Sequence, residues 1–314
     1  MELIRGSSNL RERHEGSVVT IGTFDGLHLG HQVLLRRLKE HAFRLARPAM
    51  MLTFEPMPRE YLVPARPPAR LTSWRERWHI LGERGLDYMC VLRFGEGLRS
   101  LSGDGFAELL ARRLHSHLVL VGHDFRFGRN GEATAGMLAE AGKALGFEVD
   151  VVPPVLLEGV RVSSSGVREA LASSQFELAR KWLGRPYSMT GRVVRGNQLG
   201  RELGFPTANV ALPASIAVPA DGVYAGWYLR PDGAHRPAAL SLGRRPTFYE
   251  QAELSLLEAY LLDFDGDLYG EAARVEFVAH LRGQVRFETV DDLIVQMNRD
   301  VALTREILGV ADLA

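Results

Sequence analysis

Two histidines three residues apart lie in a glycine-rich segment, and their types and spacing suit phosphate chemistry. Residues 22–31 read Gly-Thr-Phe-Asp-Gly-Leu-His-Leu-Gly-His and follow a β-branched run. Glycines let a ligand approach the backbone closely, and the free N–H groups at a helix start favour a phosphate. His28 and His31 could then donate hydrogen bonds to a phosphate under attack and to its departing neighbour. Two other interpretations stay open: a solvated helix start, and a metal site that lacks an obvious third ligand.

A second glycine-rich stretch ends in a hydroxyl and an amide. Glycines at 191, 196, 200 and 204 precede Phe-Pro-Thr-Ala-Asn at 205–209, and no Gly-Lys-Ser/Thr follows, so this is not a Walker A loop. Thr207 and Asn209 could supply hard oxygen ligands to a magnesium ion that keeps water and nucleotide phosphates as its other ligands. As isolated residues they are more often turn formers.

Glu258 interrupts an apolar strand pattern. A period of two puts it on one face with Leu254, Leu256, Tyr260 and Leu262. A carboxylate among such neighbours is costly unless it is paired or functional. The alternative is a bulge or a rim position that leaves Glu258 in water.

The elements that position the two histidines alternate regularly. Strands are predicted at residues 18–21, 50–54, 88–92, 118–121 and 149–152, and helices at 31–45, 74–81 (capped by Thr72 or Ser73), 106–114 and 137–145 (closed by Gly146). This order indicates a parallel, doubly wound sheet. Ligands of such sheets bind beyond the carboxyl ends of the strands, where the glycine-rich segment lies.

The pattern changes after Gly184, and the predicted domain boundary falls between residues 184 and 185. Strands are predicted at residues 192–195, 222–229, 238–242, 254–262 and 274–281, with a turn at 231–233 and no convincing helix between 188 and 287. Short strands of this kind favour an antiparallel barrel. A closing helix is predicted from Thr289 or Val290 to Leu308, with Thr289 and Asp292 spaced as a capping box.

Composition limits the function classes. The 314 residues suggest about two domains, and 46% apolar with 24% charged residues is ordinary for globular proteins. Lys plus Arg and Asp plus Glu each number 38, so no nucleic-acid partner and no membrane partner is predicted. The single cysteine, Cys90, excludes an intrachain disulfide and a cysteine-based zinc site. No signal-peptide pattern or long apolar run occurs, so we expect a cytoplasmic protein.

The histidine segment resembles the nucleotidyltransferase half of bifunctional riboflavin kinase/FAD synthetases. That superfamily has a second element, Ser-Ser-Thr-x-Ile-Arg, which corresponds here to residues 163–168, although the serines alone look more like helix caps. Residues 53–58 and 122–128 match as well. The resemblance implies that His28, His31 and Arg168 stabilise charge on the ATP phosphates. It implies further ATP contacts from Gly22, Phe24, Asp25, Gly30, Ser163, Ser164 and Ser165, and flavin contacts from Phe54, Pro56, Asp124, Phe125 and Phe127. The sequence departs from the family at Met57, where His is usual, and at Gly131 and Ala133.

Residues 196–209 are similar to the hallmark of riboflavin kinase, Gly-x-x-x-Gly-Arg-x-x-Gly-Phe-Pro-Thr-Ala-Asn, and further matches follow at 222–224, 243–248 and 257–270. The resemblance implies that Thr207 and Asn209 bind magnesium-ATP and that Glu258 is the base acting on the ribityl 5′-hydroxyl. It also implies phosphate contacts from Gly196, Gly200, Arg201 and Gly204. Arg282 lies in the segment that closes over the flavin in that family, and is an expected flavin contact.

The implied protein has a Rossmann-like FMN adenylyltransferase domain at residues 1–184 and a riboflavin kinase domain at 185–314, the latter a mainly antiparallel β-barrel with a C-terminal helix. It would use ATP and Mg²⁺ to convert riboflavin to FMN, and a second ATP to convert FMN to FAD and pyrophosphate. One alternative is a riboflavin kinase with an impaired adenylyltransferase half, which the departures at Met57 and near Gly131 favour slightly. The other is a flavin-binding regulatory module without turnover. Self-association is left open.

Overall fold

The structure, a computed structural model, describes residues 1–196, 199–244 and 255–311. By compactness the chain divides into two units: Met1–Pro68 with Trp74–Ser163, and Ala69–Ser73 with Ser164–Ala314. The short segment Ala69–Ser73 belongs to the second unit because Arg70 forms an isolated parallel bridge with Ile216. The predicted domain boundary between residues 184 and 185 concerns which part of the chain folds alone, and it stays a prediction.

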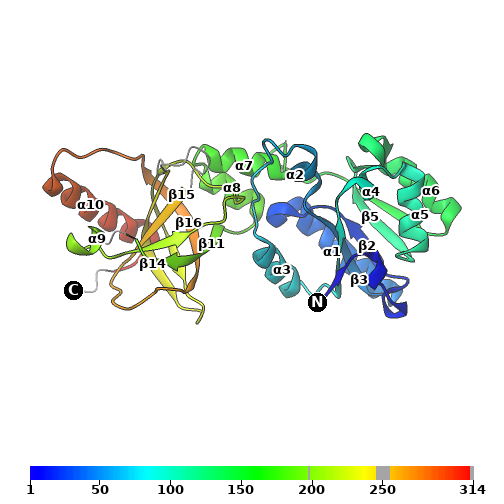
Figure 1. The fold of residues 1–314 in the computed structure, drawn as a ribbon, viewed down its shortest axis with the longest axis horizontal. Coiled ribbons are helices and arrows are strands. Elements are labelled where there is room, and N and C mark those ends of the chain that lie inside the picture. The colour runs from blue at the N-terminus through cyan, green and yellow to red at the C-terminus, as the bar shows by residue number, and fades with distance from the viewer. Residues whose placement is uncertain (197–198, 245–254, 312–314) are drawn as a thin grey trace. The chain divides into compact units, whose positions relative to one another are not determined.

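The first unit is built on a six-stranded sheet in which all neighbouring strands are parallel (Figure 1). In spatial order the strands are β1 (Glu2–Arg5), β4 (Tyr88–Arg93), β3 (Ala49–Glu55), β2 (Val18–Ile21), β5 (Leu118–Gly122) and β8 (Glu148–Val152). Five of the six were predicted. The edge strand β1 was not, because four residues with a charge at each end carry little strand signal.

Helices cover both faces of this sheet. They are α1 (Leu29–Leu45), α2 (Pro58–Leu62), α3 (Trp74–Glu83), α4 (Glu96–Arg99), α5 (Gly103–Arg112) and α6 (Ala135–Leu145). Successive strand residues point to opposite faces, so Val18 packs in one core with Leu35 of α1, while Val19 packs in the other with Phe106 of α5. The predicted doubly wound fold is therefore confirmed.

Shorter 3₁₀ turns and two-residue ladders connect these elements: η1 (Ser7–Asn9), η2 (Glu12–His14), η3 (Asp25–Leu27), η4 (Arg129–Gly131), β6 (Arg126–Phe127) with β7 (Ala133–Thr134), and β9 (Leu156–Leu157) with β10 (Val160–Arg161).

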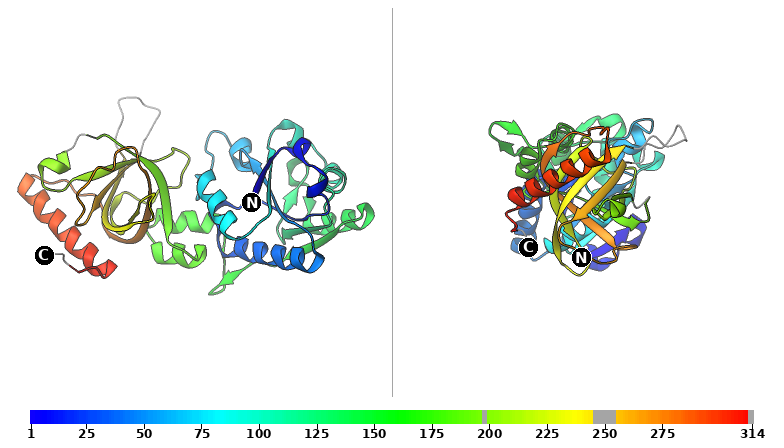
Figure 2. Two further views of the ribbon diagram at one scale, coloured as in Figure 1. Left: turned by 90° about the horizontal axis from the view of Figure 1, so that it is seen from below. Right: turned by 90° about the vertical axis from the view of Figure 1, so that its left-hand side faces the viewer.

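The second unit contains a closed antiparallel barrel, as predicted. In spatial order its strands are β11 (Tyr187–Val194), β12 (Thr207–Ala211), β15 (Ser255–Leu261), β14 (His235–Arg244), β13 (Gly222–Leu229) and β16 (Ala272–Arg282). The helices α7 (Ser164–Ala172) and α8 (Phe176–Leu183) precede the barrel. The C-terminal helix α10 (Val290–Leu308) lies across it against β13, β14 and β16 (Figure 2). The Thr289 hydroxyl accepts a hydrogen bond from the Asp292 N–H at 3.1 Å, which confirms the predicted cap.

Three features of the barrel unit differ from the sequence prediction. Strand β12 was read as a loop, because Thr207, Ala208 and Asn209 are small or polar and its strand becomes evident only through pairing with β11 and β15. A short helix, α9 (Leu199–Glu202), occurs in the region predicted to lack helices. Helix α8 was not predicted. Leu254 and the family match at residues 245–248 lie outside the described residues.

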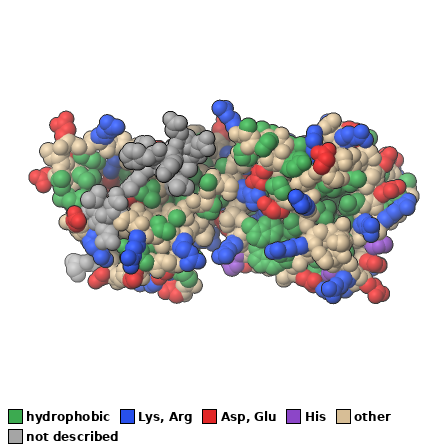
Figure 3. All heavy atoms as spheres, in the orientation of Figure 1, with side chains coloured by type: hydrophobic (Ala, Val, Ile, Leu, Met, Phe, Trp, Pro, Cys, Tyr) green, Lys and Arg blue, Asp and Glu red, His purple; other side chains and the backbone are tan. Residues whose placement is uncertain are grey.

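Charges of both signs are mixed on the surface. On the face seen in Figure 3, Lys and Arg side chains are interspersed with Asp and Glu in each unit, in keeping with the equal numbers of the two classes. Within the described ranges, no helix combines the length and the apolar character that crossing a bilayer requires.

Candidate active sites

The predicted segments of the first unit meet at one edge of the sheet. Strand β2 lies between β3 and β5, so the chain changes direction across the sheet at this strand. Gly22 follows β2, Phe54 lies near the carboxyl end of β3, and Asp124 follows β5. Because the three strands are parallel, their carboxyl ends lie together at the switch point, where doubly wound sheets bind ligands.

The loop after β2 has an unusual backbone that buried side chains hold in place. Phe24 and Leu27 adopt the left-handed conformation, with φ of 50° and 46°, and both side chains are fully buried. Such conformations in residues other than glycine often occur at functional sites. Arg77 of α3 is 0% exposed and donates a hydrogen bond from Nη1 to the Thr23 carbonyl at 2.6 Å. A buried cation therefore anchors the loop that carries the histidines.

His28 and His31 form a stacked pair at the start of α1. Their ring centroids are 3.8 Å apart at an interplanar angle of 18°. His28 is the N-cap, and its Nδ1 accepts a hydrogen bond from the His31 backbone N–H at 3.4 Å. The neutral ring then carries its proton on Nε2, which leaves that atom as a donor. A Cβ atom at position 30 would lie 3.0 Å from His28 Cε1, so Gly30 gives this ring its space.

Burial keeps both imidazoles neutral. Burial, with a smaller contribution from the Arg161 charge, lowers the pKa of His28 to about 4. Burial, followed by the nearby His28 and Arg77, also lowers the pKa of His31 well below its ordinary value. Within the described part of the chain, His31 Nδ1 is buried without a hydrogen-bond partner. The pair can therefore act as neutral hydrogen-bond donors and acceptors toward a ligand.

Sequence reasoning missed two arginines in this unit. Arg77 carries no motif signal, because only the fold brings α3 against the Thr23 carbonyl. Arg161 ends β10 and donates a hydrogen bond from Nη2 to Asp124 Oδ2 at 2.5 Å. The Arg161 charge also contributes to lowering the pKa of His28. The position of Arg161 just before the serine element is the signal that could have identified it.

The predicted aromatic flavin contacts are largely core residues. Phe54 and Phe127 are each 7% exposed and pack in the hydrophobic core. Phe125 is partly buried and stacks on Phe127, with the two ring centroids 5.4 Å apart. Met57, which follows Pro56, is 5% exposed, and its backbone N–H donates to Glu60 Oε2 at 2.9 Å.

The serine element lies where the two compact units divide. Ser163 ends the first unit, whereas Ser164, Ser165 and Arg168 belong to α7 of the second. Arg168 donates a hydrogen bond from Nε to the Ala69 carbonyl at 2.6 Å. A Cβ at Gly166 would lie 2.0 Å from the Trp182 ring, so this glycine allows α8 to pack against α7.

In the barrel, three polar residues form a row across neighbouring strands. Asn209 of β12 and Ser241 of β14 are the direct partners of Glu258 of β15, one on each side. Directly opposed residues in antiparallel strands have Cβ atoms roughly 5 Å apart and point to the same face. The fully buried face of β15 is the other one, with Leu257 and Ala259 both at 0% exposure. The sequence predicted apolar neighbours around Glu258, and the structure confirms this only in part. The face of β15 that carries Glu258 is half-buried and lines a cavity.

Three cavities adjoin this row, and one of them, of about 460 Å³, is lined by Ser241 and Glu258 together with Asp221 and Arg286. The other two are lined by Thr207 and Asn209. The first of these two, which we call the helix cavity because α10 forms one wall, has a volume of about 330 Å³. The second, the loop cavity, has about 500 Å³ and is lined by Arg201, Pro206 and the segment from Phe264 to Tyr269. Glu258 also lines the helix cavity. Arg282, the predicted flavin contact, and Phe287 also line the helix cavity, with the Arg282 guanidinium 5.8 Å from the Phe287 ring centroid.

The glycines of the hallmark stretch allow the backbone to approach the two polar side chains. A Cβ at Gly196 would lie 2.4 Å from Asn209 Nδ2, and one at Gly200 would lie 2.4 Å from the Phe205 carbonyl oxygen. Gly204 follows α9 in a left-handed conformation. Thr207 and Asn209 line both the helix cavity and the loop cavity, and a hydroxyl and an amide oxygen are ligands that suit a hard cation such as Mg²⁺. For the residues described, no three or more His, Cys, Asp or Glu side chains are grouped to hold a metal, at the histidine pair or elsewhere.

Comparison with known proteins shows similarity along nearly the whole chain. A protein of Pseudomonas fluorescens named bifunctional riboflavin kinase/FMN adenylyltransferase is 43% identical over 308 residues, which cover 98% of each chain. A protein of Escherichia coli K12 with the same name is 40% identical over 311 residues and 98% of each chain. A crystal structure described as a macrolide-efflux protein from Streptococcus pneumoniae is 31% identical, with a TM-score of 0.88, and covers 97% of this chain and 99% of that one.

The doubly wound sheet, the closed barrel and the family matches define a bifunctional transferase. The FAD synthetase family model matches residues 10–166, and the riboflavin kinase family model matches residues 183–308. The chain belongs to the family of bifunctional riboflavin kinase/FMN adenylyltransferases.

Proposed function

We propose that this chain catalyses two successive ATP-dependent transfers, with the barrel phosphorylating riboflavin to FMN and the N-terminal part of the chain adenylylating FMN to FAD. Matches to both family models and to full-length bifunctional relatives support both activities. The observation that carries the residue assignment is the direct pairing of Asn209 with Glu258 at the wall of the helix cavity.

In the kinase reaction, Glu258 is the general base. Riboflavin occupies the helix cavity, with its ribityl 5′-hydroxyl beside the Glu258 carboxylate, and the nucleotide occupies the loop cavity. Glu258 accepts the hydroxyl proton while the oxygen attacks the γ-phosphate of ATP, which gives FMN and ADP. Thr207 and Asn209 line both cavities and therefore border the path between the two substrates.

Thr207 Oγ1 and Asn209 Oδ1 are the groups that would hold Mg²⁺ with the nucleotide. The ion supplies charge neutralisation at the transferring phosphate when it is bound. Gly196, Gly200 and Gly204 let the backbone approach the phosphates, and Arg201 adds a positive charge at the loop cavity.

In the adenylyltransferase reaction, an FMN phosphate oxygen attacks the α-phosphate of ATP and pyrophosphate leaves. His28 donates from Nε2 to the phosphates, and His31 and Arg168 stabilise the developing charge. Gly22, Gly30 and the loop backbone at Phe24 and Asp25 receive the nucleotide, with Ser163, Ser164 and Ser165 completing the phosphate contacts. Phe54, Pro56, Asp124, Phe125 and Phe127 border the flavin.

The test is incubation with riboflavin, ATP and Mg²⁺, followed by chromatographic separation of FMN and FAD over time. FMN should form first and FAD should follow. A riboflavin kinase with an impaired first unit would accumulate FMN without FAD, and would make no FAD from supplied FMN. A binding module without turnover would retain flavin but release no ADP.

A further inference from the structure

The charged residues around the helix cavity are unequally divided between the two signs. Among the described residues that line it, Glu258 and Asp300 are acidic and Arg282 is basic. Asp300 lies on α10, the wall opposite the barrel strands, and its side chain is 8% exposed, against 19% for Arg282. Arg282 is the single cation of this set. Whether its charge can attract a ligand therefore depends on its pairing with Asp300.

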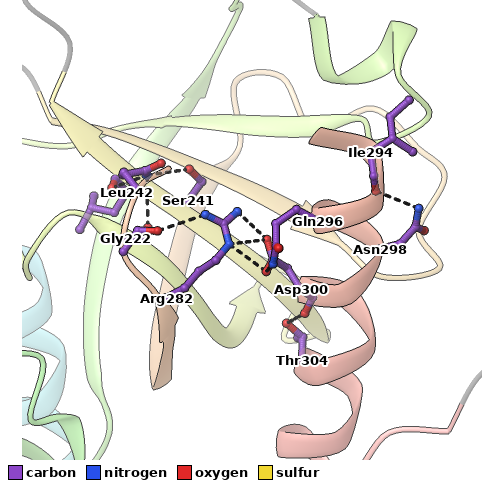
Figure 4. Close-up of polar contacts among 11 residues, drawn as sticks. Gly222, Ser241, Leu242, Arg282, Ile294, Gln296, Asn298, Asp300 and Thr304 are labelled. Atoms are coloured by element: carbon purple, nitrogen blue, oxygen red, sulfur yellow. Dashed lines mark hydrogen bonds and ion pairs between the residues drawn. The ribbon is translucent and has the colours of Figure 1, made fainter. Parts of the chain in front are cut away.

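Asp300 occupies one full edge of the Arg282 guanidinium (Figure 4). Arg282 Nε donates to both carboxylate oxygens at 3.0 and 3.1 Å, and Nη2 donates to Oδ2 at 2.7 Å. Arg282 Nη1 donates to the Gly283 carbonyl at 3.1 Å. Bidentate pairing of this kind joins the two charges strongly and fixes the plane of the guanidinium.

Neighbouring groups hold the Asp300 carboxylate in place. Gln296, one turn earlier on α10, donates from Nε2 to Asp300 Oδ1 at 2.9 Å, and the Thr304 hydroxyl donates to the Asp300 carbonyl at 2.7 Å. The carboxylate therefore accepts from two partners and is oriented by its own helix. The arrangement keeps the Arg282 charge compensated before any ligand enters.

The flavin changes its charge during the kinase reaction. Riboflavin is neutral, whereas a phosphate monoester carries about 1.5 to 2 negative charges near neutral pH. With Arg282 compensated, the described lining residues leave the cavity net negative through Glu258. The cavity should therefore accept riboflavin and disfavour FMN, which must leave the barrel before it can be adenylylated.

We propose that Asp300 is a positioning and charge-compensating residue that prevents Arg282 from retaining the phosphorylated product. This proposal rests on the proposed kinase function of the barrel. Without the Asp300 charge, Arg282 would attract the FMN phosphate across the cavity and FMN would become a stronger product inhibitor. Riboflavin, being neutral, would be affected much less.

The experiment measures riboflavin phosphorylation by the full chain as ADP release, with FMN added as inhibitor. ADP reports the barrel site alone, because adenylylation releases pyrophosphate instead. The quantity compared is the FMN inhibition constant divided by the riboflavin KM. In Asp300→Asn this ratio should fall by about 3- to 30-fold, the range expected when one unit charge is removed from a partly wet cavity. Added salt should reduce the change.

Three further variants separate charge from structure. Adding Arg282→Gln to Asp300→Asn removes the freed cation, and the double variant should return to the wild-type ratio. Gln296→Lys leaves the ion pair intact but adds a cation beside it, so it should lower the ratio and remains usable if Asp300→Asn is unstable. Asp263→Asn is the matched control, because Asp263 pairs with Arg305 of the same helix at 2.6 Å and Asp263 does not line the cavity. It should leave the ratio unchanged.

An unchanged ratio in folded Asp300→Asn or Gln296→Lys would overturn the proposal. A fall in the Asp263→Asn control of the same size as in Asp300→Asn would overturn it too, by tracing the effect to the anchoring of α10. Persistence of tight FMN inhibition in the double variant would show that the Arg282 charge is not its cause. If the wild-type chain releases no ADP with riboflavin, the kinase function itself fails.

Discussion

Asn209 and Glu258 are direct partners across the antiparallel pair of β12 and β15, so an amide and a carboxylate project side by side toward the same cavity. The pairing joins a residue of the hallmark stretch to one about fifty positions later. Ser241 flanks Glu258 on the other side. The hydrogen-bond register of the barrel, rather than any loop, thus sets the spacing of the proposed base and the proposed magnesium ligand.

The histidine pair gives a prediction for the second reaction. His31→Ala should lower FAD formation from FMN by about 10²- to 10³-fold, because it removes a donor from the developing charge. Riboflavin phosphorylation should survive, so FMN should accumulate. Chromatography of the products and pyrophosphate release measure both effects. Full-rate FAD formation by folded His31→Ala would refute the proposed role of the pair.

The lowered pKa of His28 makes the stability of the first unit depend on pH. Its folded pKa of about 4 lies below the ordinary value of 6.5, so the unfolded chain binds more protons between these values. The contribution is fully present above about pH 6.5 and is lost as the pH falls toward about 4. His28 alone should cost about 2 kcal/mol between about pH 7.5 and pH 5.

Urea unfolding of His28→Asn at the same two pH values checks this prediction. Asn keeps an N-cap acceptor for the His31 N–H but does not titrate. The variant should lose less stability on acidification than the wild type. An equal loss in both proteins would assign the acid sensitivity to other groups.

Met57 is predicted to tune adenylylation. Restoring the family's usual His should raise FAD formation and leave riboflavin phosphorylation unchanged, if the imidazole assists the incoming phosphates. The Met57 side chain is 5% exposed, so an introduced ring would be buried, which favours its neutral form. Steady-state rates of both reactions decide the matter, and an unchanged or lower FAD rate would indicate that this pocket has adapted around Met57.

The domain boundary can be tested with two fragments. Residues 185–314 are predicted to fold alone and to phosphorylate riboflavin. In the structure, however, Phe176 of α8 is 5% exposed and its ring lies 5.2 Å from that of Tyr224 and 5.7 Å from that of Phe277 in the barrel. A fragment of residues 164–314 should therefore be more stable, by about 3–5 kcal/mol if losing this contact resembles a Phe→Ala change in a core. Comparable urea midpoints would show that α8 contributes little, and a folded 185–314 fragment without kinase activity would refute the autonomous domain.

The sequence predicted those parts of the molecule that local pattern determines. The run at residues 18–21 and the helix closing at Leu308 were found because β-branched residues and a Thr289 cap leave local signals. Strand β12 was missed because Thr207–Ala211 forms a strand only against partners distant in sequence. The surroundings of Glu258 were predicted only in part for the same reason. The sequence showed a carboxylate on an apolar face, but its half-buried position depends on a cavity that α10 closes.

Residues that act through tertiary contacts left no motif. Arg77 reaches the Thr23 carbonyl, and Asp300 pairs with Arg282, across elements that only the fold brings together. Charged residues on predicted helices look alike whether they face water or a buried partner. The histidine and hallmark motifs were visible because their chemistry depends on residues close together in the chain.

The most direct test of the whole account is Glu258→Gln, which keeps size and hydrogen bonding but removes the base. FMN production should fall by about 10²- to 10⁴-fold, while FAD formation from supplied FMN should continue near the original rate. Glu276→Gln is the matched control, because Glu276 lies on β16 and pairs with Arg274 at 3.0 Å, outside the lining of both cavities. Circular dichroism should show both variants folded. Normal riboflavin phosphorylation by folded Glu258→Gln would contradict the base assignment, and loss of both reactions would contradict the separation of the two sites.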